Sequence, residues 1–366
     1  MKKCKLTDIC TPKQWKTIPT SELMDSGYPV YGANGVIGYY RDYNHEKPTV
    51  TITCRGATCG NINLTIPQSY VTGNAMCLDN VDENVVVKYL YYAMQAFNFT
   101  KVISGSAQPQ ITRENLQKVE ICVYSIEKQS MIVNHLEAVE RLIHNRKMQL
   151  EKLYELVQSR FIELFSGKKY NYVKTSDVCD FITKGTTPRS DEIFEEYEAG
   201  RVPYLKVYNL SLTGALLFDD APQYINISTH EEKLARSKVY PNDVLMNIVG
   251  PPLGKFALVT NEFDEWNINQ AIAIFRPREK VIPKFLMAAL MQPDVLQPFL
   301  QQAVGIRQLN LSLEQCRNLE IPLPPIELQQ QFATFVEEVD KSKSAIQKSL
   351  DELEILKKSL MQKYFG

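Results

Sequence analysis

The sequence predicts a mixed α+β chain with an internal repeat, in which two tandem α/β globules are joined by two long helices. Three observations predict this fold class. One segment recurs 200 positions later, short β-branched runs alternate with turn residues, and two long stretches contain neither Pro nor Gly. A repeat of this length that occurs only twice indicates a duplicated domain rather than a solenoid.

The repeat is clearest in GSAQPQITRENLQKVEI, which starts at Gly105, and GIRQLNLSLEQCRNLEI, which starts at Gly305. The offset of 200 holds without a gap from there to Phe165 and Phe365. Upstream the offset is smaller: it is 169 where KLTDIC matches KTSDVC, and 196 where NAMCL matches QAIAI. Most of this growth falls within 207–247, so we expect the second unit to carry an insertion there.

Each globule is expected to mix strands with helices. The runs PTVTITC, AMCLDNV, DVLMNIV and AIAIFRP are rich in β-branched and apolar residues and lie among Gly, Pro and Asn turns, which is typical of strands. Helical patterns follow in VVVKYLYYAMQAF and PKFLMAALMQ. GATCGN and GPPLGK occupy the same place in the two units, which identifies each as a Gly-bracketed loop between strands.

The stretches 127–165 and 326–365 are predicted to be long helices, each about 60 Å long at the usual rise per residue. Apolar residues recur in both at spacings of three and four, which is the pattern of a coiled coil.

Basic residues interrupt both apolar stripes, in slots that are apolar in the other helix. One hypothesis is that the helices pair with one another and that these slots set their register and orientation. The alternative is that the long cationic stems simply pass the seam and reach solvent. The four residues are Arg146, Arg160, Lys343 and Lys357.

Composition describes an ordinary globular chain of 366 residues, 44% hydrophobic and 23% charged, with room for two or three domains. The formal net charge of −1 argues against a strongly basic nucleic-acid binder but leaves room for a local basic face. No apolar run is long enough to span a membrane and the N-terminus has no signal-peptide core, so we expect a cytoplasmic protein. The eight cysteines form no CxxC pair and are expected to be reduced thiols without zinc.

The motifs of a catalytic site are missing from the sequence. GPPLGK is one residue short of a phosphate-binding P-loop and lacks the Ser or Thr after its lysine. There is no GxGxxG, no Asn-Pro-Pro-aromatic segment of the kind amino-methyltransferases use, and no HxxxH among four histidines. We therefore do not expect this chain to be an enzyme by itself.

Several phrases resemble the specificity subunits of type I restriction–modification systems. YPVYGANGVIGYY, TCRGATCGN, TGNAMCL and GSAQPQIT are similar to the first recognition domain of that family. LEIPLPPIELQQQFATFVEEVD is similar to its segment in which an IPLPP phrase opens a long helix. The first unit departs from that phrase with VEICVYSIEKQS, although the resemblance covers nearly the whole chain in both halves.

The resemblance implies a fold with a pseudo-twofold internal repeat. It implies target recognition domain 1 at 1–125, spacer helix 1 at 126–167, target recognition domain 2 at 168–325 and spacer helix 2 at 326–366. The helices would pair antiparallel and fix the distance between two half-sites of a bipartite double-stranded DNA site. The specificity chain of this family has no active site, in agreement with the missing motifs.

The resemblance also implies partners and cofactors. Two methyltransferase subunits would dock on the chain, and restriction subunits could join them. S-adenosylmethionine, ATP and Mg²⁺ would be bound by those partners, with no cofactor in this chain. Two alternatives remain open: a coiled-coil tether that binds proteins but not DNA, and a self-sufficient methyltransferase or nuclease, which the missing motifs disfavour.

Candidate DNA contacts are polar residues in loops, because Arg matches guanine edges, Asn and Gln match adenine edges, and Lys and hydroxyl groups bind phosphates. Asn34 also suits a turn for backbone reasons alone. In the first unit the candidates are Tyr31, Asn34, Tyr39, Arg41, Arg55, Thr58, Asn74, Gln108 and Gln110. In the second they are Lys184, Thr186, Thr187, Arg189, Lys206, Tyr208, Asn209, Lys255, Asn269, Gln270, Arg307 and Gln308.

Overall fold

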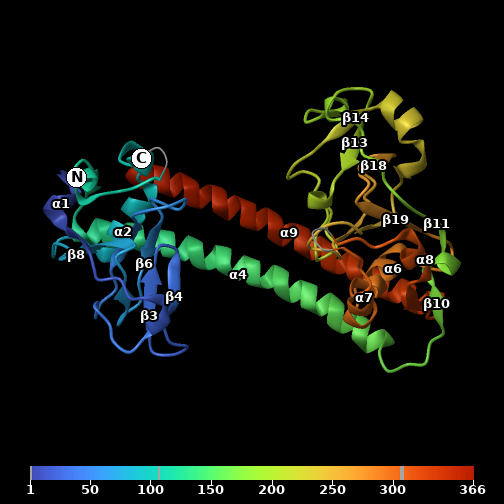
Figure 1. The fold of residues 1–366 in the computed structure, drawn as a ribbon, viewed down its shortest axis with the longest axis horizontal. Helices are drawn as coiled ribbons and strands as arrows, with labels where there is room; N and C mark the ends of the chain where they lie inside the picture. Colours follow the sequence, from blue (N-terminus) through green and yellow to red (C-terminus); the bar gives the residue numbers. More distant parts are fainter. Residues whose placement is uncertain (1, 106–107, 306–308) are drawn as a thin grey trace. The chain divides into compact units, whose positions relative to one another are not determined.

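The computed structural model describes residues 2–105, 108–305 and 309–366, which divide into two compact units. Unit 1 comprises Met1–Met148 and Gln347–Gly366, and unit 2 comprises Gln149–Ile346. Each unit contains a mixed globule and parts of both long helices (Figure 1).

The globule of unit 1 is built from three small sheets and short helices. Its main sheet has the strand order β2-β8-β5-β6 and is antiparallel throughout. A second sheet, β4-β3-β7, contains the parallel pair β3–β7, and β1 pairs with β9. The strands are β1 Lys2–Lys5, β2 Thr11–Gln14, β3 Tyr28–Gly32, β4 Gly35–Tyr40, β5 Val50–Thr53, β6 Ile62–Leu64, β7 Tyr70–Val71, β8 Ala75–Asp79 and β9 Glu120–Val123. The helices are α1 Leu6–Ile9, η1 Thr20–Glu22, α2 Val87–Ala96, η2 Phe99–Lys101 and α3 Arg113–Leu116.

The globule of unit 2 repeats this plan with more strands. Its main sheet has the order β11-β19-β16-β17, a five-stranded sheet has the order β12-β14-β13-β18-β15, and β10 pairs with β20. The strands are β10 Tyr172–Lys174, β11 Cys179–Lys184, β12 Ile193–Phe194, β13 Arg201–Leu205, β14 Tyr224–Asn226, β15 Lys238–Val239, β16 Val244–Asn247, β17 Phe256–Leu258, β18 Trp266–Ile268, β19 Ile272–Pro277 and β20 Glu320–Pro322. The helical elements are α5 Thr175–Val178, η3 Ser190–Glu192, η4 Val207–Asn209, η5 Thr229–Lys233, η6 Ala235–Ser237, α6 Pro283–Leu290, α7 Pro293–Leu300 and α8 Leu313–Asn318.

The predicted duplication is confirmed strand by strand. The order β2-β8-β5-β6 of unit 1 corresponds to β11-β19-β16-β17 of unit 2. The parallel pair β3–β7 has its counterpart in β13–β18. The insertion expected within 207–247 is also present. It supplies the strands β14 and β15 of the five-stranded sheet and the helical elements η5 and η6.

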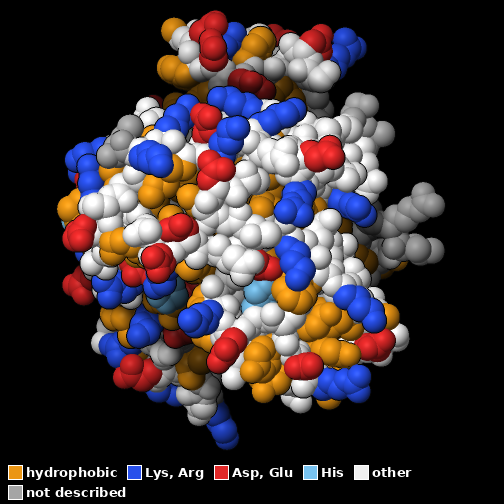
Figure 2. All heavy atoms as spheres, turned by 90° about the vertical axis from the view of Figure 1, so that its left-hand side faces the viewer, with side chains coloured by type: hydrophobic (Ala, Val, Ile, Leu, Met, Phe, Trp, Pro, Cys, Tyr) orange, Lys and Arg blue, Asp and Glu red, His pale blue; other side chains and the backbone are white. Residues whose placement is uncertain are grey.

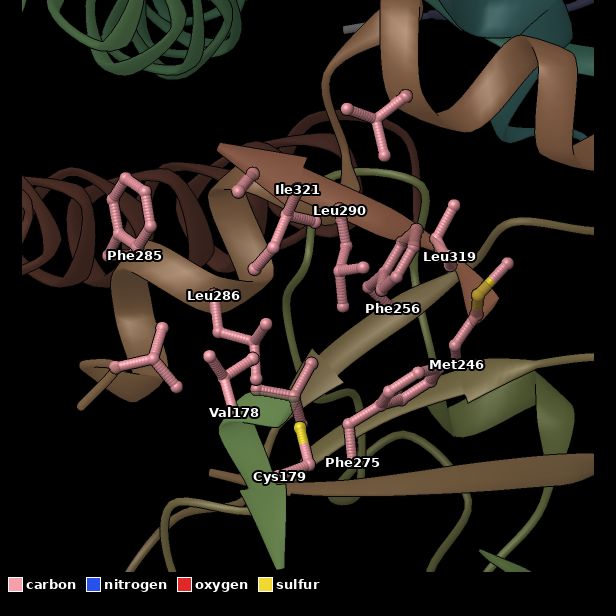
Figure 3. Close-up of a cluster of buried hydrophobic side chains, with 14 of the residues drawn as sticks. Val178, Cys179, Met246, Phe256, Phe275, Phe285, Leu286, Leu290, Leu319 and Ile321 are labelled. Carbon is pink, nitrogen blue, oxygen red and sulfur yellow. The ribbon is translucent and has the colours of Figure 1, made fainter. Parts of the chain in front are cut away.

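Each globule has its own apolar core between its main sheet and its helices. In unit 1, buried Val50, Ile52 and Leu78 of the sheet pack with Leu90 and Met94 of α2. In unit 2, side chains of α6 meet those of the sheet and of β20 (Figure 3). The side chains in that close-up include Val178, Cys179, Met246, Phe256, Phe275, Phe285, Leu286, Leu290, Leu319 and Ile321.

Both predicted long helices are present as α4, Ile126–Phe165, and α9, Ile326–Phe365. In unit 1 the first half of α4 packs against the last turns of α9, where Ile132 and Leu136 share a buried cluster with Tyr364. As α4 residue numbers rise from Glu140 to Arg146, their α9 partners fall from Lys357 to Ser349. The two segments therefore run antiparallel in unit 1.

In unit 2 the last turns of α4 pack against the first turns of α9. The ring centroids of Phe161 and Phe332 lie 5.4 Å apart, and both rings also contact Phe285 or Phe165. Each unit thus holds opposite ends of the two helices side by side, which confirms that α4 and α9 pack together.

Cationic side chains in the apolar stripes reach partners in both helices. In unit 1, Lys357 of α9 forms an ion pair with Glu140 of α4 at 2.7 Å, and Arg146 donates to the Ser349 hydroxyl at 3.2 Å. In unit 2, the Arg160 guanidinium lies 5.7 Å from the Phe335 ring centroid. Of the four slots, Arg146, Arg160 and Lys357 contact the facing helix and do not merely extend into solvent.

Candidate nucleic-acid interface

Three loops of unit 1 meet at one edge of its main sheet. The Cys54 amide donates to the Asn74 carbonyl at 3.2 Å, and the Ile111 amide donates to the Cys54 carbonyl at 2.9 Å. The Gly56 amide donates to the Pro109 carbonyl at 3.2 Å. These backbone bonds bring four predicted residues to this edge, namely Arg55, Asn74, Gln108 and Gln110.

A shallow cleft of about 430 Å³ lies beside this edge. The turn that holds Asn34 reaches it because the Thr53 hydroxyl donates to the Ala33 carbonyl. Asn34 and Thr58, both predicted, line the cleft together with Asn61, Asn63 and Gln95, which sequence reasoning missed. The polar run CGNIN was the available signal for the two asparagines, whereas Gln95 comes from the helix α2 and only the tertiary structure places it here.

The remaining predicted residues of unit 1 lie elsewhere. Tyr31 is buried, and its hydroxyl accepts a hydrogen bond from the Ile66 amide at 3.3 Å, so it serves the interior of the globule. Tyr39 and Arg41 are exposed, but they lie at the far end of β4 from the Asn34 turn.

In unit 2, two loops approach each other at a glycine. The Gly185 amide donates to the Ile272 carbonyl at 3.1 Å, and a Cβ at Gly185 would collide with the carbonyls of Asn269 and Ile268. The Gln270 amide donates to the Thr187 hydroxyl at 3.4 Å. The Asn269 amide donates to the Leu205 carbonyl at 3.0 Å, which adds the segment that follows β13. The predicted residues that meet at this edge are Thr186, Thr187, Lys206, Asn269 and Gln270.

Arg236 joins the edge of unit 2 from the insertion. Its guanidinium donates to the Thr186 hydroxyl at 3.2 and 3.3 Å, and the residue is exposed. Sequence reasoning missed it, because nothing local in the insertion shows that η6 lies beside the loop that follows β11.

The loop 248–255 of unit 2 has the same position as the loop 54–61 of unit 1. The Gly250 amide donates to the Leu309 carbonyl at 2.9 Å, as Gly56 does to Pro109, and Leu311 bonds to Ile248 as Ile111 does to Cys54. This places half-buried Lys255 near the edge.

Other predicted residues of unit 2 divide into exposed and buried ones. Lys184 at the end of β11, Arg189 in the loop that follows it and Tyr208 in η4 are exposed. Asn209 is fully buried. Its side-chain amide donates to the Leu217 carbonyl and accepts from the Lys206 amide, so its polar atoms stabilise the fold. Arg307 and Gln308 lie outside the described residues.

Two side-chain groups among the described residues have the composition of a metal site, and in both of them candidate ligands already have protein partners. In unit 1, the ring nitrogens of His45 already contact Asp79 and Asn44 at 2.9 and 2.6 Å. Burial raises the pKa of the neighbouring Cys77 thiol, which disfavours the thiolate a metal requires.

The group in unit 2 is satisfied by protein partners in the same way. His230 is fully buried, with one ring nitrogen bonded to Glu265 at 2.9 Å and the other accepting from Asn267 at 3.1 Å. Lys238 forms ion pairs with Glu231 at 2.6 Å and with Glu265 at 3.4 Å.

Surface charge is mixed on the part of the molecule that Figure 2 shows, where Lys and Arg side chains are interspersed with Asp and Glu. On that face, binding of a polyanion would therefore depend on local donors and acceptors more than on a broad positive field. Within the described residues no helix is long and apolar enough to span a membrane.

These features define a class of protein with two candidate interfaces of one design, each carried on a globule that packs against a long helix. The sequence matches the family described as "Type I restriction modification DNA specificity domain" over residues 1–152 and 167–355. The chain belongs to this family, whose members are the specificity subunits, and not the catalytic subunits, of type I restriction–modification enzymes.

Individual relatives agree with this assignment. The chain is 30% identical over 118 residues to the EcoprrI specificity subunit of Escherichia coli, covering 32% of this chain and 29% of that one. It is 22% identical to the EcoBI specificity subunit of Escherichia coli, covering 94% of this chain and 75% of that one.

A solved type I restriction–modification S subunit from M. genitalium shares the fold with a TM-score of 0.63 and 17% identity, covering 100% of this chain and 96% of the other. A second structure, from work titled as the structural basis of complex assembly and conformational transition of the type I R-M system, gives 0.56 and 18%, covering 100% and 97%.

Proposed function

We propose that each globule of this specificity subunit reads one half of a bipartite DNA site. The duplicated loop edge carries the proposal, because two globules of one fold present polar side chains from corresponding loops. Arg, Asn and Gln can pair with base edges in the major groove, while Lys, Thr and backbone amides bind phosphates. Because the side chains of the two edges differ, the two half-sites are expected to differ in sequence.

Within this proposal, residues 1–125 and 168–325 are the target recognition domains, and 126–167 and 326–366 are the spacer helices. The proposed DNA contacts are the exposed and half-buried residues at or near the two edges, together with Tyr39 and Arg41, which are exposed elsewhere on the globule of unit 1. Tyr31 and Asn209 are left out because they are buried. The contacts are Asn34, Tyr39, Arg41, Arg55, Thr58, Asn74, Gln108 and Gln110 in unit 1, and Lys184, Thr186, Thr187, Arg189, Lys206, Tyr208, Arg236, Lys255, Asn269 and Gln270 in unit 2.

The proposed partners are two methyltransferase subunits that dock on the chain in the cytoplasm, with restriction subunits as further members of the complex. S-adenosylmethionine, ATP and Mg²⁺ would be held by those subunits. The family supports this arrangement, since a specificity subunit selects the target on which other subunits act.

The test is to co-express the chain with the methyltransferase subunit that an adjacent gene encodes. Adenine methylation is then mapped across the genome of a host that lacks other adenine methylation. We expect one bipartite motif with a fixed spacer. Replacing residues 1–125 by the same region of another specificity subunit should change one half of the motif and leave the other half intact.

The control is the reciprocal replacement of residues 168–325, which should change only the other half. If the chain bound no DNA with or without a methyltransferase, the proposal would be wrong and a protein-binding tether would be the better description.

A further inference from the structure

Two buried glutamines occupy the same position at the start of the two long helices. Gln129 of α4 and Gln329 of α9 are both 0% exposed. Burying a primary amide is unfavourable unless its carbonyl and its NH₂ group both find partners. Two such residues in equivalent places therefore indicate a specific task.

In unit 1 the Gln129 carboxamide makes three hydrogen bonds. Its oxygen accepts from the Val86 amide at 2.8 Å, and its nitrogen donates to the carbonyls of Asn84 and Tyr124, each at 2.8 Å. Val86 is the residue before α2 and Tyr124 lies just before α4. One side chain thus joins the beginning of the globule helix, the end of the globule and the long helix.

In unit 2 Gln329 makes the same three bonds. Its oxygen accepts from the Ile282 amide at 2.9 Å, and its nitrogen donates to the carbonyls of Pro324 at 2.9 Å and Lys280 at 3.3 Å. Ile282 is the residue before α6. The contact has therefore been kept in both halves, although the loops that form the two edges differ.

A second repeated contact lies further along each helix pair. In unit 1, Lys88 of α2 pairs with Glu137 of α4. In unit 2, Lys284 of α6 lies 3.6 Å from Glu337 and 3.7 Å from Asp340 of α9. Two polar contacts at different heights fix the direction of the short helix along the long one, whereas apolar contacts alone are not directional.

We propose that Gln129 and Gln329 are positioning residues that fix the angle of each recognition globule on its helix, and that this angle lets the subunit discriminate between spacer lengths. The inference rests on the proposed reading of bipartite DNA. One additional base pair moves a half-site by about 3.4 Å and rotates it by roughly a tenth of a turn around the duplex. A globule held by three directional bonds cannot follow that movement, whereas a globule that can tilt follows it.

The experiment uses the full chain in complex with its methyltransferase subunits. Methylation is mapped at genomic sites with the cognate spacer and with spacers one base pair shorter or longer. For Gln129→Met, which keeps the side-chain length and removes all three hydrogen bonds, we expect unchanged half-site sequences. We expect methylation at the wrong spacers, relative to the cognate spacer, to rise by about tenfold or more.

Gln330→Met is the matched control, because Gln330 is exposed on α9 beside Gln329. It should keep the wild-type spacer preference, whereas Gln329→Met should relax it as Gln129→Met does. Gln129→Glu serves as a second variant should Gln129→Met fail to assemble, because a carboxylate still accepts from Val86 while losing both donors. It should relax the preference in the same direction.

Equal loss of methylation at all spacers, or an unchanged preference in an assembled Gln129→Met or Gln129→Glu complex, would overturn the proposal and leave the glutamines with a role in stability alone. Absence of a bipartite motif in the wild type would instead contradict the underlying function, so the two failures are distinguishable.

Discussion

At the scale of single residues, the shape of the two edges is set by hydrogen bonds between backbone groups and not by side-chain contacts. Arg55 and Gln110 are bridge partners, and Arg55 projects from a segment whose amides and carbonyls bond to neighbouring loops. A rigid backbone reduces the conformational entropy lost when such a side chain binds. A rigid backbone also confines the structural effect of substituting one of these side chains to its own position.

If Arg55 contacts a base, Arg55→Ala is expected to weaken DNA binding by about 1–3 kcal/mol and to reduce methylation accordingly. The specificity for the base at one position of one half-site should then be relaxed. If Arg55 contacts a phosphate, binding should weaken evenly across sequences and depend less steeply on salt. Binding to duplexes with each base changed in turn separates the two outcomes. Lys118→Ala, an exposed residue of the same globule, is the control and should behave as the wild type.

Gly185 shows how one residue sets the geometry of the edge in unit 2. Its lack of a side chain permits the loop after β11 to lie against the carbonyls of Asn269 and Ile268. Any larger residue would push apart the loops that hold Thr187 and Gln270. The sequence contains GTT in a suitable loop, but only the fold shows why glycine is required there.

At the scale of elements, the junction of α2, α4 and α9 in unit 1 is held by both apolar and polar contacts. Glu140 accepts from the Tyr92 hydroxyl at 2.7 Å and pairs with Lys357 at 2.7 Å, so one carboxylate connects three helices. Burial, and then this carboxylate, raise the pKa of Tyr92, which therefore remains a hydrogen-bond donor.

Glu140→Ala is expected to lower the free energy of unfolding by about 1–2 kcal/mol, because it leaves the half-buried Lys357 and the Tyr92 hydroxyl without their acceptor. Urea denaturation followed by circular dichroism measures the change. Glu151→Ala, at an exposed position of α4, should change the stability by less than about 0.5 kcal/mol. Equal effects of the two substitutions would contradict the structural assignment.

The insertion of unit 2 is predicted to loosen in acid. The hydrogen bond with His230 lowers the pKa of Glu265 below its ordinary value of 4.5, and the bond with Lys233 does the same for Glu192. A carboxyl whose pKa is lower in the folded state stabilises that state above its ordinary value, and this stabilisation is lost as the pH falls through the lowered value.

Hydrogen exchange across Thr229–Ser237 should therefore accelerate, after correction for intrinsic rates, as the pH falls from about 5 to 3, before β16 is affected. Glu265→Gln should reduce the pH dependence, because the amide cannot titrate. Simultaneous loss of protection in β16 and in the insertion would show that the acid effect is global and not local.

At the scale of the whole molecule, α4 links the two globules along the chain and α9 follows the second globule. Each unit contains opposite ends of α4 and α9. We expect the length of the helix pair to set the spacer of the DNA site, while the loops of each globule set its half-site.

Inserting one heptad into both α4 and α9, at matched heights, keeps the apolar seam in phase and adds about 10 Å to the pair. The spacer should lengthen by about three base pairs at about 3.4 Å each, with both half-sites unchanged. Methylation mapping checks this, and a heptad added to α4 alone should abolish methylation because the seam loses its register. Altered half-site bases with an unchanged spacer would contradict the role of the helices.

The sequence by itself determined the duplication, the position of the insertion and the two long helices. These features have local signals: residue identities at a constant offset, apolar periodicities of two and 3.6, and the absence of Pro and Gly from 127–165 and 326–365. It also predicted Arg55, Asn74, Thr186 and Gln270, which the structure places at the two edges, because polar residues in turn-like segments are visible without a structure.

Only the tertiary structure decided which polar residues share an edge and which are buried. Tyr31 and Asn209 have the chemistry of a DNA contact, yet the packing around them uses their polar atoms inside the globule. Arg236 and Gln95 reach the edges from an insertion and a helix that are distant in sequence. Burial and long-range contact depend on how separate segments fold together, so no pattern within one segment can reveal them.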